Sequence, residues 1–230
     1  MSGPDGRTFQ DPASASLQWC AARGARQSHE VLKTVRRRPD FTAAVRALIT
    51  HVAASFDDFR HLEARRIVVV AGEARRASRG TVKPLTFAGR KRTDSMGRKK
   101  PLVKLDGKVM LYCITLRPLF FRHSTPRQRV ATVLHELFHI SKAFDGTLDH
   151  LRRHDEAGDG FEAEFAPIER RVWKRLPPEL VAPFAYDGEV RVQQWLEKPQ
   201  SWLPGERASH RGLYDERHLF EGIVRLKTTV

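Results

Sequence analysis

The sequence predicts an α+β fold, in which a small mixed sheet packs on a central helix and further helices flank it. Apolar residues recur at helical spacing in three stretches, residues 41–60, 126–143 and 160–175. Between the first two lie a β-branched run at 67–70 and a hairpin pattern at 102–116, which indicate strands. With 230 residues and a hydrophobic content of 40%, the chain can form one domain with its own core.

The first predicted helix, residues 41–60, begins after Pro39-Asp40, a typical start signal. Its apolar residues are three or four positions apart, so they share one face of the helix and predict a side that packs on the core. This stripe comprises Phe41, Val45, Leu48, Ile49, Val52, Phe56 and Phe59.

Strands are predicted next along the chain. The run at 67–70 is typical of a short buried strand. Residues 81–87 predict a second strand, and Pro84 favours a sheet edge or an irregular course because proline cannot donate to a ladder. Residues 102–116, interrupted by Asp106-Gly107, predict a hairpin with a tight turn.

The helix at 126–143 has the clearest signals. Thr125 is a candidate N-cap, Pro126 suits the first helical position, and Gln128 completes a capping box. Asp145-Gly146 is a plausible stop. The residues expected to face the core are Val130, Val133, Leu134, Leu137 and Phe138.

This helix carries an H-E-x-x-H motif, formed by His135, Glu136 and His139. Residues four apart lie on one helix face, so both imidazoles can hold the same ion, and Glu136 lies close enough to act as a base on a water. Two neutral nitrogen ligands, an open metal position and a carboxylate are what zinc hydrolysis needs. The alternative is a surface helix with two unrelated histidines.

A catalytic zinc site needs a third protein ligand. Six residues downstream of the motif have suitable side chains. These candidates are Asp149, His150, His154, Asp155, Glu162 and Glu164.

Two segments of this region contain histidines: His135-Glu136-Leu137-Phe138-His139-Ile140 and Leu151-Arg152-Arg153-His154-Asp155. Phe161 and a helix follow them. Together these features resemble the metallopeptidases of prokaryotes and their phages. The resemblance covers roughly residues 60–175. It implies a zincin-like fold, with a small twisted mixed sheet over the H-E-x-x-H helix. It also implies Zn²⁺ bound by His135, His139 and His154, with Glu136 as the base.

The chain departs from this pattern at residues 157–160, which lengthen the gap before Phe161. That insertion leaves His150, Glu162 and Glu164 open as third ligands, although an imidazole suits zinc and favours His154.

Asp155 adjoins the favoured third ligand and is predicted to orient a ligating imidazole, because zinc-bound histidines usually donate their other N–H to a carboxylate or carbonyl. Asp149 and Asp145 could serve instead, and a solvated loop aspartate is the alternative.

In zincin-like folds an edge strand also pairs with an extended substrate. Residues 108–116 are our hypothesis for that strand, against an ordinary core strand.

The closing helix at 160–175 should turn Phe161, Phe165, Ile168 and Val172 inward, with Pro167 kinking it or delaying its regular start, and Pro177-Pro178 ending it. We expect three regions along the chain. They are a disordered tail rich in small and polar residues at 1–28, the zincin-like domain at 29–178 and a C-terminal extension at 179–230.

The net charge of +14 can attract nucleic acid or another acidic partner, and solvated charges without a partner are the alternative. Residues 88–101 form a predicted exposed loop rich in cations. Aromatic residues are not interleaved with the basic runs, which weakens the case for a surface that stacks the bases of single strands.

No apolar run reaches about eighteen residues, and residues 1–28 lack a secretory h-region, so we expect no membrane span or export signal. Cys20 and Cys113 are far apart, and Cys113 is expected to be a buried free thiol. The predicted compartment is the reducing cytoplasm.

The function that the motif favours is a zinc-dependent peptidase acting on a protein or peptide substrate. Two alternatives use the same residues differently: a non-catalytic protein in which zinc staples helix to loop, and a DNA-associated protein that binds through a basic surface. The sequence contains no paired C-x-x-C motifs, glycine-rich phosphate loop, G-x-S-x-G elbow or internal repeat. The oligomeric state stays open.

Overall fold

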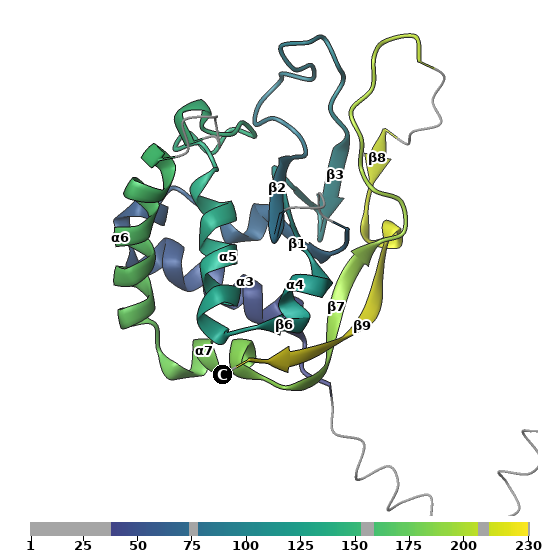
Figure 1. The fold of residues 1–230 in the computed structure, drawn as a ribbon. Helices are drawn as coiled ribbons and strands as arrows, with labels where there is room; N and C mark the ends of the chain where they lie inside the picture. The colour runs from purple at the N-terminus through teal and green to yellow at the C-terminus, as the bar shows by residue number, and fades with distance from the viewer. Residues whose placement is uncertain (1–37, 74–77, 153–158, 207–211, 230) are drawn as a thin grey trace, which may run out of the picture. The chain divides into compact units, whose positions relative to one another are not determined.

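A mixed three-stranded sheet, in the order β1-β5-β2, lies at the centre of the fold (Figure 1). Strand β1 (Ile67–Ala71) pairs parallel with β5 (Tyr112–Leu116), and β2 (Gly80–Pro84) pairs antiparallel with the other side of β5. Every residue of β1 and β5 is buried. This computed structural model describes residues 38–73, 78–152, 159–206 and 212–229.

The two faces of β1 enter different apolar clusters. Ile67, Val69 and Ala71 pack in the main core with the helices. Val68 and Val70 face the other way, into a smaller cluster that includes Val103, Met110 and Tyr214. The sheet is therefore covered on both faces, which explains why β1 reads as a continuous apolar run.

Four helices contribute to the main core. They are α3 (Phe41–Ser55), α5 (Pro126–Phe138), α6 (Asp159–Arg175) and α7 (Pro178–Ala185). Helix α3 starts as predicted, with the Asp40 side chain accepting from the Ala43 N–H at 2.8 Å. Helix α5 starts with the predicted capping box between Thr125 and Gln128. The residues predicted to point inward from α6 are buried, and Pro167 lies inside that helix.

The predicted hairpin at Asp106-Gly107 is confirmed. Strand β3 (Leu102–Leu105) pairs with β4 (Lys108–Val109), and both turn residues have positive φ, 49° for Asp106 and 72° for Gly107. Strand β8 (Leu213–Tyr214) completes this second sheet on the other side of β3.

The hypothesis of one strand over 108–116 is wrong. Strand β4 belongs to the hairpin, while β5 begins at Tyr112 in the central sheet. Between them, the Met110 N–H donates to Val103 and the Leu111 N–H donates to Arg66, so the chain changes partner at this point. Since β5 has β1 and β2 on its two sides, residues 112–116 have no edge to offer a substrate.

The C-terminal region contributes a long antiparallel pair that the sequence did not predict. Strand β7 (Gly188–Trp195) pairs with β9 (Leu219–Thr228) over its whole length, and β9 also pairs with the short β6 (His123–Ser124). A short helix, α4 (Pro118–Arg122), precedes β6.

The buried guanidinium of Arg129 ties α5 to this C-terminal region. Its Nη1 donates to the carbonyl of Phe184 at 2.7 Å and to the hydroxyl of Thr228 at 3.3 Å, and its Nε donates to Ser124 at 3.1 Å. Residues 38–230 form one compact unit. The boundaries expected after residues 28 and 178 stay predictions.

Two further expectations concern side chains and membranes. Cys113 is buried with a free thiol, and the Trp195 indole N–H donates to its sulfur at 3.5 Å. Over the ranges given above, no helix is both long and apolar enough to cross a bilayer.

Candidate metal centre

Both motif histidines lie at the C-terminal end of α5. His135 is in the last turn and His139 is the C-cap, because the helix ends at Phe138, earlier than the predicted residue 143. The chain turns there: the Ile140 N–H donates to Leu137, and Ile140 forms a bridge with Leu148. The two imidazole centroids are 4.9 Å apart and their planes cross at 82°. The pair is therefore side by side, half-buried and at a helix end.

A backbone carbonyl indicates which tautomer His139 adopts. Its Nδ1 lies 2.5 Å from the carbonyl oxygen of Arg152. A carbonyl only accepts, so Nδ1 carries the proton and Nε2 keeps its lone pair. Zinc-ligating histidines commonly make this type of contact. The sequence predicted such a partner but assigned it to a carboxylate, Asp155, which lies outside the described residues.

Arg152 holds this carbonyl in place with its own side chain. The guanidinium carbon lies 3.8 Å above the Phe138 ring centroid, and Nη1 donates to the Phe138 carbonyl at 3.3 Å. Nη2 donates to Glu164 at 2.9 Å, and Nε lies 3.6 Å from a carboxylate oxygen of Asp149. Since Arg152 is only 7% exposed, these contacts fix the loop beside His139.

Aromatic rings of α6 form a wall behind the histidines. The Phe161 ring is stacked on His139, with centroids 4.7 Å apart and an interplanar angle of 22°, and it lies 4.7 Å edge-on from His135. Phe165 contacts His135 at 5.4 Å. Packing of this type restricts the orientation of both imidazoles.

Glu136 points away from solvent toward strand β2. Its side chain is buried, and burial raises the pKa of its carboxyl to about 7, while a hydrogen bond from the Val82 backbone N–H acts in the opposite direction. A carboxyl with a pKa near neutrality can both take and return a proton at physiological pH.

Gly80 explains how β2 approaches this carboxylate so closely. A Cβ at position 80 would lie 3.2 Å from both Cγ and Oε1 of Glu136 and 3.3 Å from Cγ2 of Thr132. Only a residue without a side chain leaves Glu136 its present position. The glycine follows a run of basic residues, and nothing in its local sequence indicates this role.

The described residues do not supply a complete ligand set. Across 38–73, 78–152, 159–206 and 212–229, no three His, Cys, Asp or Glu side chains gather as a metal site. His150 and Glu162 are exposed, and Glu164 is bound to Arg152. His154, the predicted third ligand, lies outside these ranges.

Comparison with known proteins identifies the family. A family model described as "Putative phage metallopeptidase" matches residues 35–182, which is more than half of the chain. The chain belongs to this family. No curated protein and no solved structure matches the chain.

The family match spans α3 through most of α7 and so includes the central sheet and the H-E-x-x-H helix. Strands β7 and β9 follow the matched region, although they pack within the same compact unit. The resemblance inferred from the two histidine segments is therefore confirmed at the level of the family.

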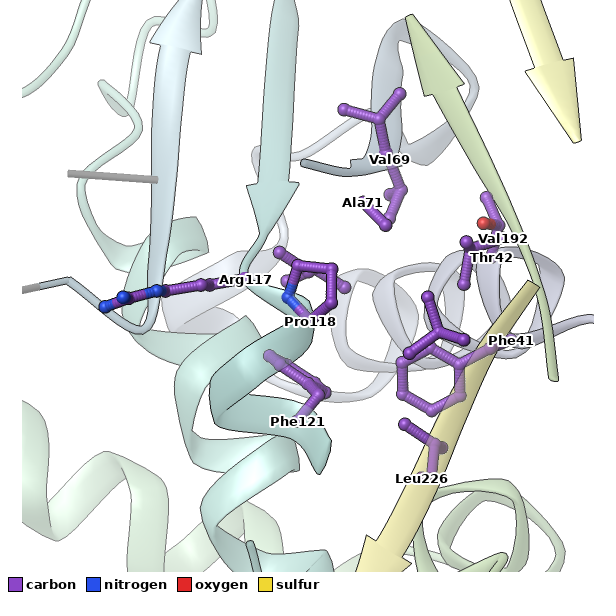
Figure 2. A pocket seen from close by; sticks show the side chains of 12 residues that line it. Phe41, Thr42, Val69, Ala71, Arg117, Pro118, Phe121, Val192 and Leu226 are labelled. Carbon is purple, nitrogen blue, oxygen red and sulfur yellow. The ribbon is translucent and has the colours of Figure 1, made fainter. Parts of the chain in front are cut away.

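An apolar pocket lies elsewhere in the fold. It has a volume of about 20 Å³ and lies at the edge of β1, and Figure 2 shows its wall of aliphatic and aromatic side chains. None of the lining residues is a His, Cys, Asp or Glu. This pocket has no group for acid–base or metal chemistry, so it is not a candidate metal centre. The residues labelled in the figure are Phe41, Thr42, Val69, Ala71, Arg117, Pro118, Phe121, Val192 and Leu226.

Proposed function

We propose that this protein is a zincin-like, zinc-dependent metallopeptidase that hydrolyses peptide bonds in protein or peptide substrates. One observation carries the proposal: two adjacent imidazoles and a buried carboxylate share the C-terminal half of α5 beside an edge strand. A protein that used zinc only as a staple would gain nothing from burying Glu136, because burial of a carboxylate costs stability.

The residues present fit a zinc ion. The Nδ1–H of His139 donates to a backbone carbonyl, a contact typical of zinc-ligating histidines, and His135 lies next to it. His135, His139 and His154 would hold the ion. When bound, zinc would polarise the substrate carbonyl and lower the pKa of a water.

Glu136 is the general base of this proposal. Its carboxylate would accept a proton from the attacking water and deliver that proton to the leaving amine. In the zinc-free protein, burial raises the pKa of this carboxyl to about 7, which favours its accepting a proton. The Val82 N–H donates a hydrogen bond to the carboxylate, and Gly80 has no side chain that would displace it.

Strand β2 replaces residues 108–116 as our candidate for substrate pairing. It is an edge strand, it contacts α5, and its backbone reaches Glu136. An extended peptide could add to this edge by main-chain hydrogen bonds.

His154 remains the preferred third ligand. The Arg152 carbonyl contacts His139, and His154 is two residues further along the chain, a separation of at most about 7 Å between Cα atoms. Zinc titration should show that His154→Ala weakens binding at least about 100-fold, whereas His150→Ala and Glu162→Ala change it little. Strong loss in Glu162→Ala or Glu164→Ala instead would reassign the ligand.

Asp155 is proposed to orient a ligating imidazole. Asp155→Asn should weaken zinc binding by about 10–100-fold. A change within about twofold would remove Asp155 from the site.

The test of the activity itself is cleavage of a fluorescence-quenched peptide library by purified protein of known metal content. Hydrolysis should stop after chelation and return with one equivalent of Zn²⁺ per chain. A protein that binds zinc at His135 and His139 but cleaves no member of the library would contradict the peptidase proposal.

Nucleic-acid binding through residues 88–101 is an alternative use of an exposed basic loop, considered below. The reducing cytoplasm stays part of the proposal, on the ground of the two distant cysteines.

A further inference from the structure

Residues 88–101, which connect β2 to β3, form a loop with a large charge excess, called the basic loop here. It contains six Lys and Arg residues and one carboxylate, Asp94. Asp94 accepts from the backbone of Met96 and Arg98, and from Nε of Arg98 at 2.9 Å. The loop's only carboxylate therefore balances one of its own cations.

Four cations of the basic loop are available to a partner. They are exposed, and none forms an ion pair with a carboxylate in the described part of the chain. The four are Arg90, Lys91, Arg92 and Lys99.

The backbone of the basic loop is held in place by hydrogen bonds. Lys99 and Trp202 exchange two bonds, of 2.7 and 3.1 Å, and the Lys100 N–H donates to Arg92 at 2.9 Å. A charged surface on a fixed backbone loses less conformational freedom on binding than a flexible loop does.

The base of the basic loop is joined to the loop that follows α5. The Ala88 N–H donates to Asp145 at 2.8 Å, and Gly146 packs so tightly that a Cβ there would lie 2.0 Å from the Thr86 carbonyl oxygen. In Figure 1 the β2–β3 connection rises at the end of the molecule where α5 ends and the loop after it begins. A chain extended along β2 beside Glu136 would therefore continue onto the basic loop.

We propose that the basic loop binds acidic side chains of the polypeptide substrate next to the bond that is cleaved. This inference deepens the proposed function and rests on it. It names a substrate class: a segment with Asp or Glu residues on the side of the cleavage site that lies over residues 88–101.

A polypeptide fits this surface better than a single-stranded nucleic acid does. The aromatic ring at the base of the loop, Phe87, is only 7% exposed, and the ammonium groups of Lys91 and Lys100 lie 4.9 and 5.3 Å from its centroid. The ring is covered and offers no face for stacking a base. The adjoining edge of β2 is instead suited to main-chain pairing with a peptide.

The test measures binding separately from cleavage. Full-length Glu136→Gln protein is titrated with fluorescein-labelled peptides in which Glu, Gln or Lys alternates with Ala, at low and high NaCl. The loop variant reverses the four available cations: Arg90→Glu, Lys91→Glu, Arg92→Glu and Lys99→Glu. A control variant makes the same charge change at exposed cations outside the loop: Arg122→Glu, Arg170→Glu, Arg225→Glu and Lys227→Glu.

The Glu peptide should bind roughly tenfold more tightly than the Gln peptide at low salt, and the difference should shrink as salt screens these exposed pairs. In the loop variant the order should invert, so that the Lys peptide binds best, while the control variant keeps the original order. Equal binding of all three peptides, or equal behaviour of loop and control variants, overturns the inference.

Two further outcomes distinguish this inference from nucleic-acid binding and from the proposed function. If duplex DNA binds and only the loop variant loses it, while the peptides are bound without preference, nucleic acid is the partner and the inference fails. If the Glu peptide binds through the loop but wild-type protein hydrolyses no peptide, the preference for acidic side chains stands, while the proposed function and the position beside a cleaved bond fail.

Discussion

The two edges of the central sheet differ in what lies against them. Beside β1 are α3 and β7, and the space between them is the apolar pocket of Figure 2. In that view the Arg117 side chain extends away from the apolar cluster. Beside β2 is α5, which places the buried carboxylate of Glu136 against the backbone of Val82. Apolar side chains line the β1 edge, whereas the β2 edge holds a titratable carboxyl group.

This difference separates stability from chemistry within one sheet. The β1 edge gains stability from the burial of apolar surface, without polar groups that need partners. The β2 edge bears a cost, because a carboxylate is removed from water, and a cost of this kind is typical of sites kept for function. Substitutions at the β1 edge should therefore change mainly the free energy of unfolding, and substitutions at the β2 edge mainly the rate of turnover.

The largest expected effect is on turnover at the β2 edge. Glu136→Gln should lower kcat by about 10²–10⁴-fold, because the amide cannot act as a base, while zinc content stays at the wild-type level. Peptide hydrolysis and metal analysis on the same sample check this. Glu179→Gln, an exposed carboxylate on α7, is the matched control and should retain full activity. Unchanged turnover in Glu136→Gln would exclude the role of Glu136 as base.

The next effect concerns stability at the β1 edge. Leu226 on β9 is buried and lines the pocket, so Leu226→Ala should lower the free energy of unfolding by about 2–5 kcal/mol. Activity per folded, zinc-loaded molecule should not change. Urea denaturation and kinetics below the transition measure the two quantities. A loss of kcat comparable with that of Glu136→Gln would show that the two edges are not independent.

The third effect tests the cost of the buried carboxylate in zinc-free protein. The pKa of Glu136 is raised from 4.5 to about 7 in the folded state. Because the folded state holds this proton more tightly, stability falls as pH rises from about 4.5 to about 7, and the full penalty is present above pH 7. Glu136→Gln removes the ionisable group. It should therefore stabilise the chelated protein by about 3 kcal/mol more at pH 8 than at pH 4.

The measurement is urea denaturation at both pH values, with Glu179→Gln as the control. Equal stabilisation by Glu136→Gln at pH 4 and pH 8 would show that Glu136 has an ordinary pKa.

Local signals in the sequence predicted much of this arrangement. The capping box at Thr125 and Gln128 fixed the start of α5, and the spacing of His135 and His139 placed both rings together. The paired positive φ values at Asp106-Gly107 confirmed the hairpin. Each of these features depends on residues within one or two turns of chain.

What the sequence did not predict depends on long-range pairing. Strand β5 binds β1 and β2, both of which precede the hairpin, so its separation from β4 is not visible in the local pattern. Strands β7 and β9 are separated by residues 196–218 and find each other only in the folded chain. Arg152 stood inside the predicted L-R-R-H-D segment, but its role depends on its backbone carbonyl, which residue type does not reveal.

The smallest effect examines how closely β2 must approach the base. Gly80→Ala adds a methyl group 3.2 Å from Oε1 of Glu136, so the carboxylate must move by a few tenths of an ångström. Misplacement of about 1 Å can cost about 100-fold in rate, so we expect kcat to fall by roughly tenfold, with zinc content unchanged. Gly160→Ala on α6 is the control, because no atom lies within 4 Å of its added Cβ. If both variants turn over at the wild-type rate, the β2 edge tolerates a side chain, and the contact with Val82 alone must hold the base in place.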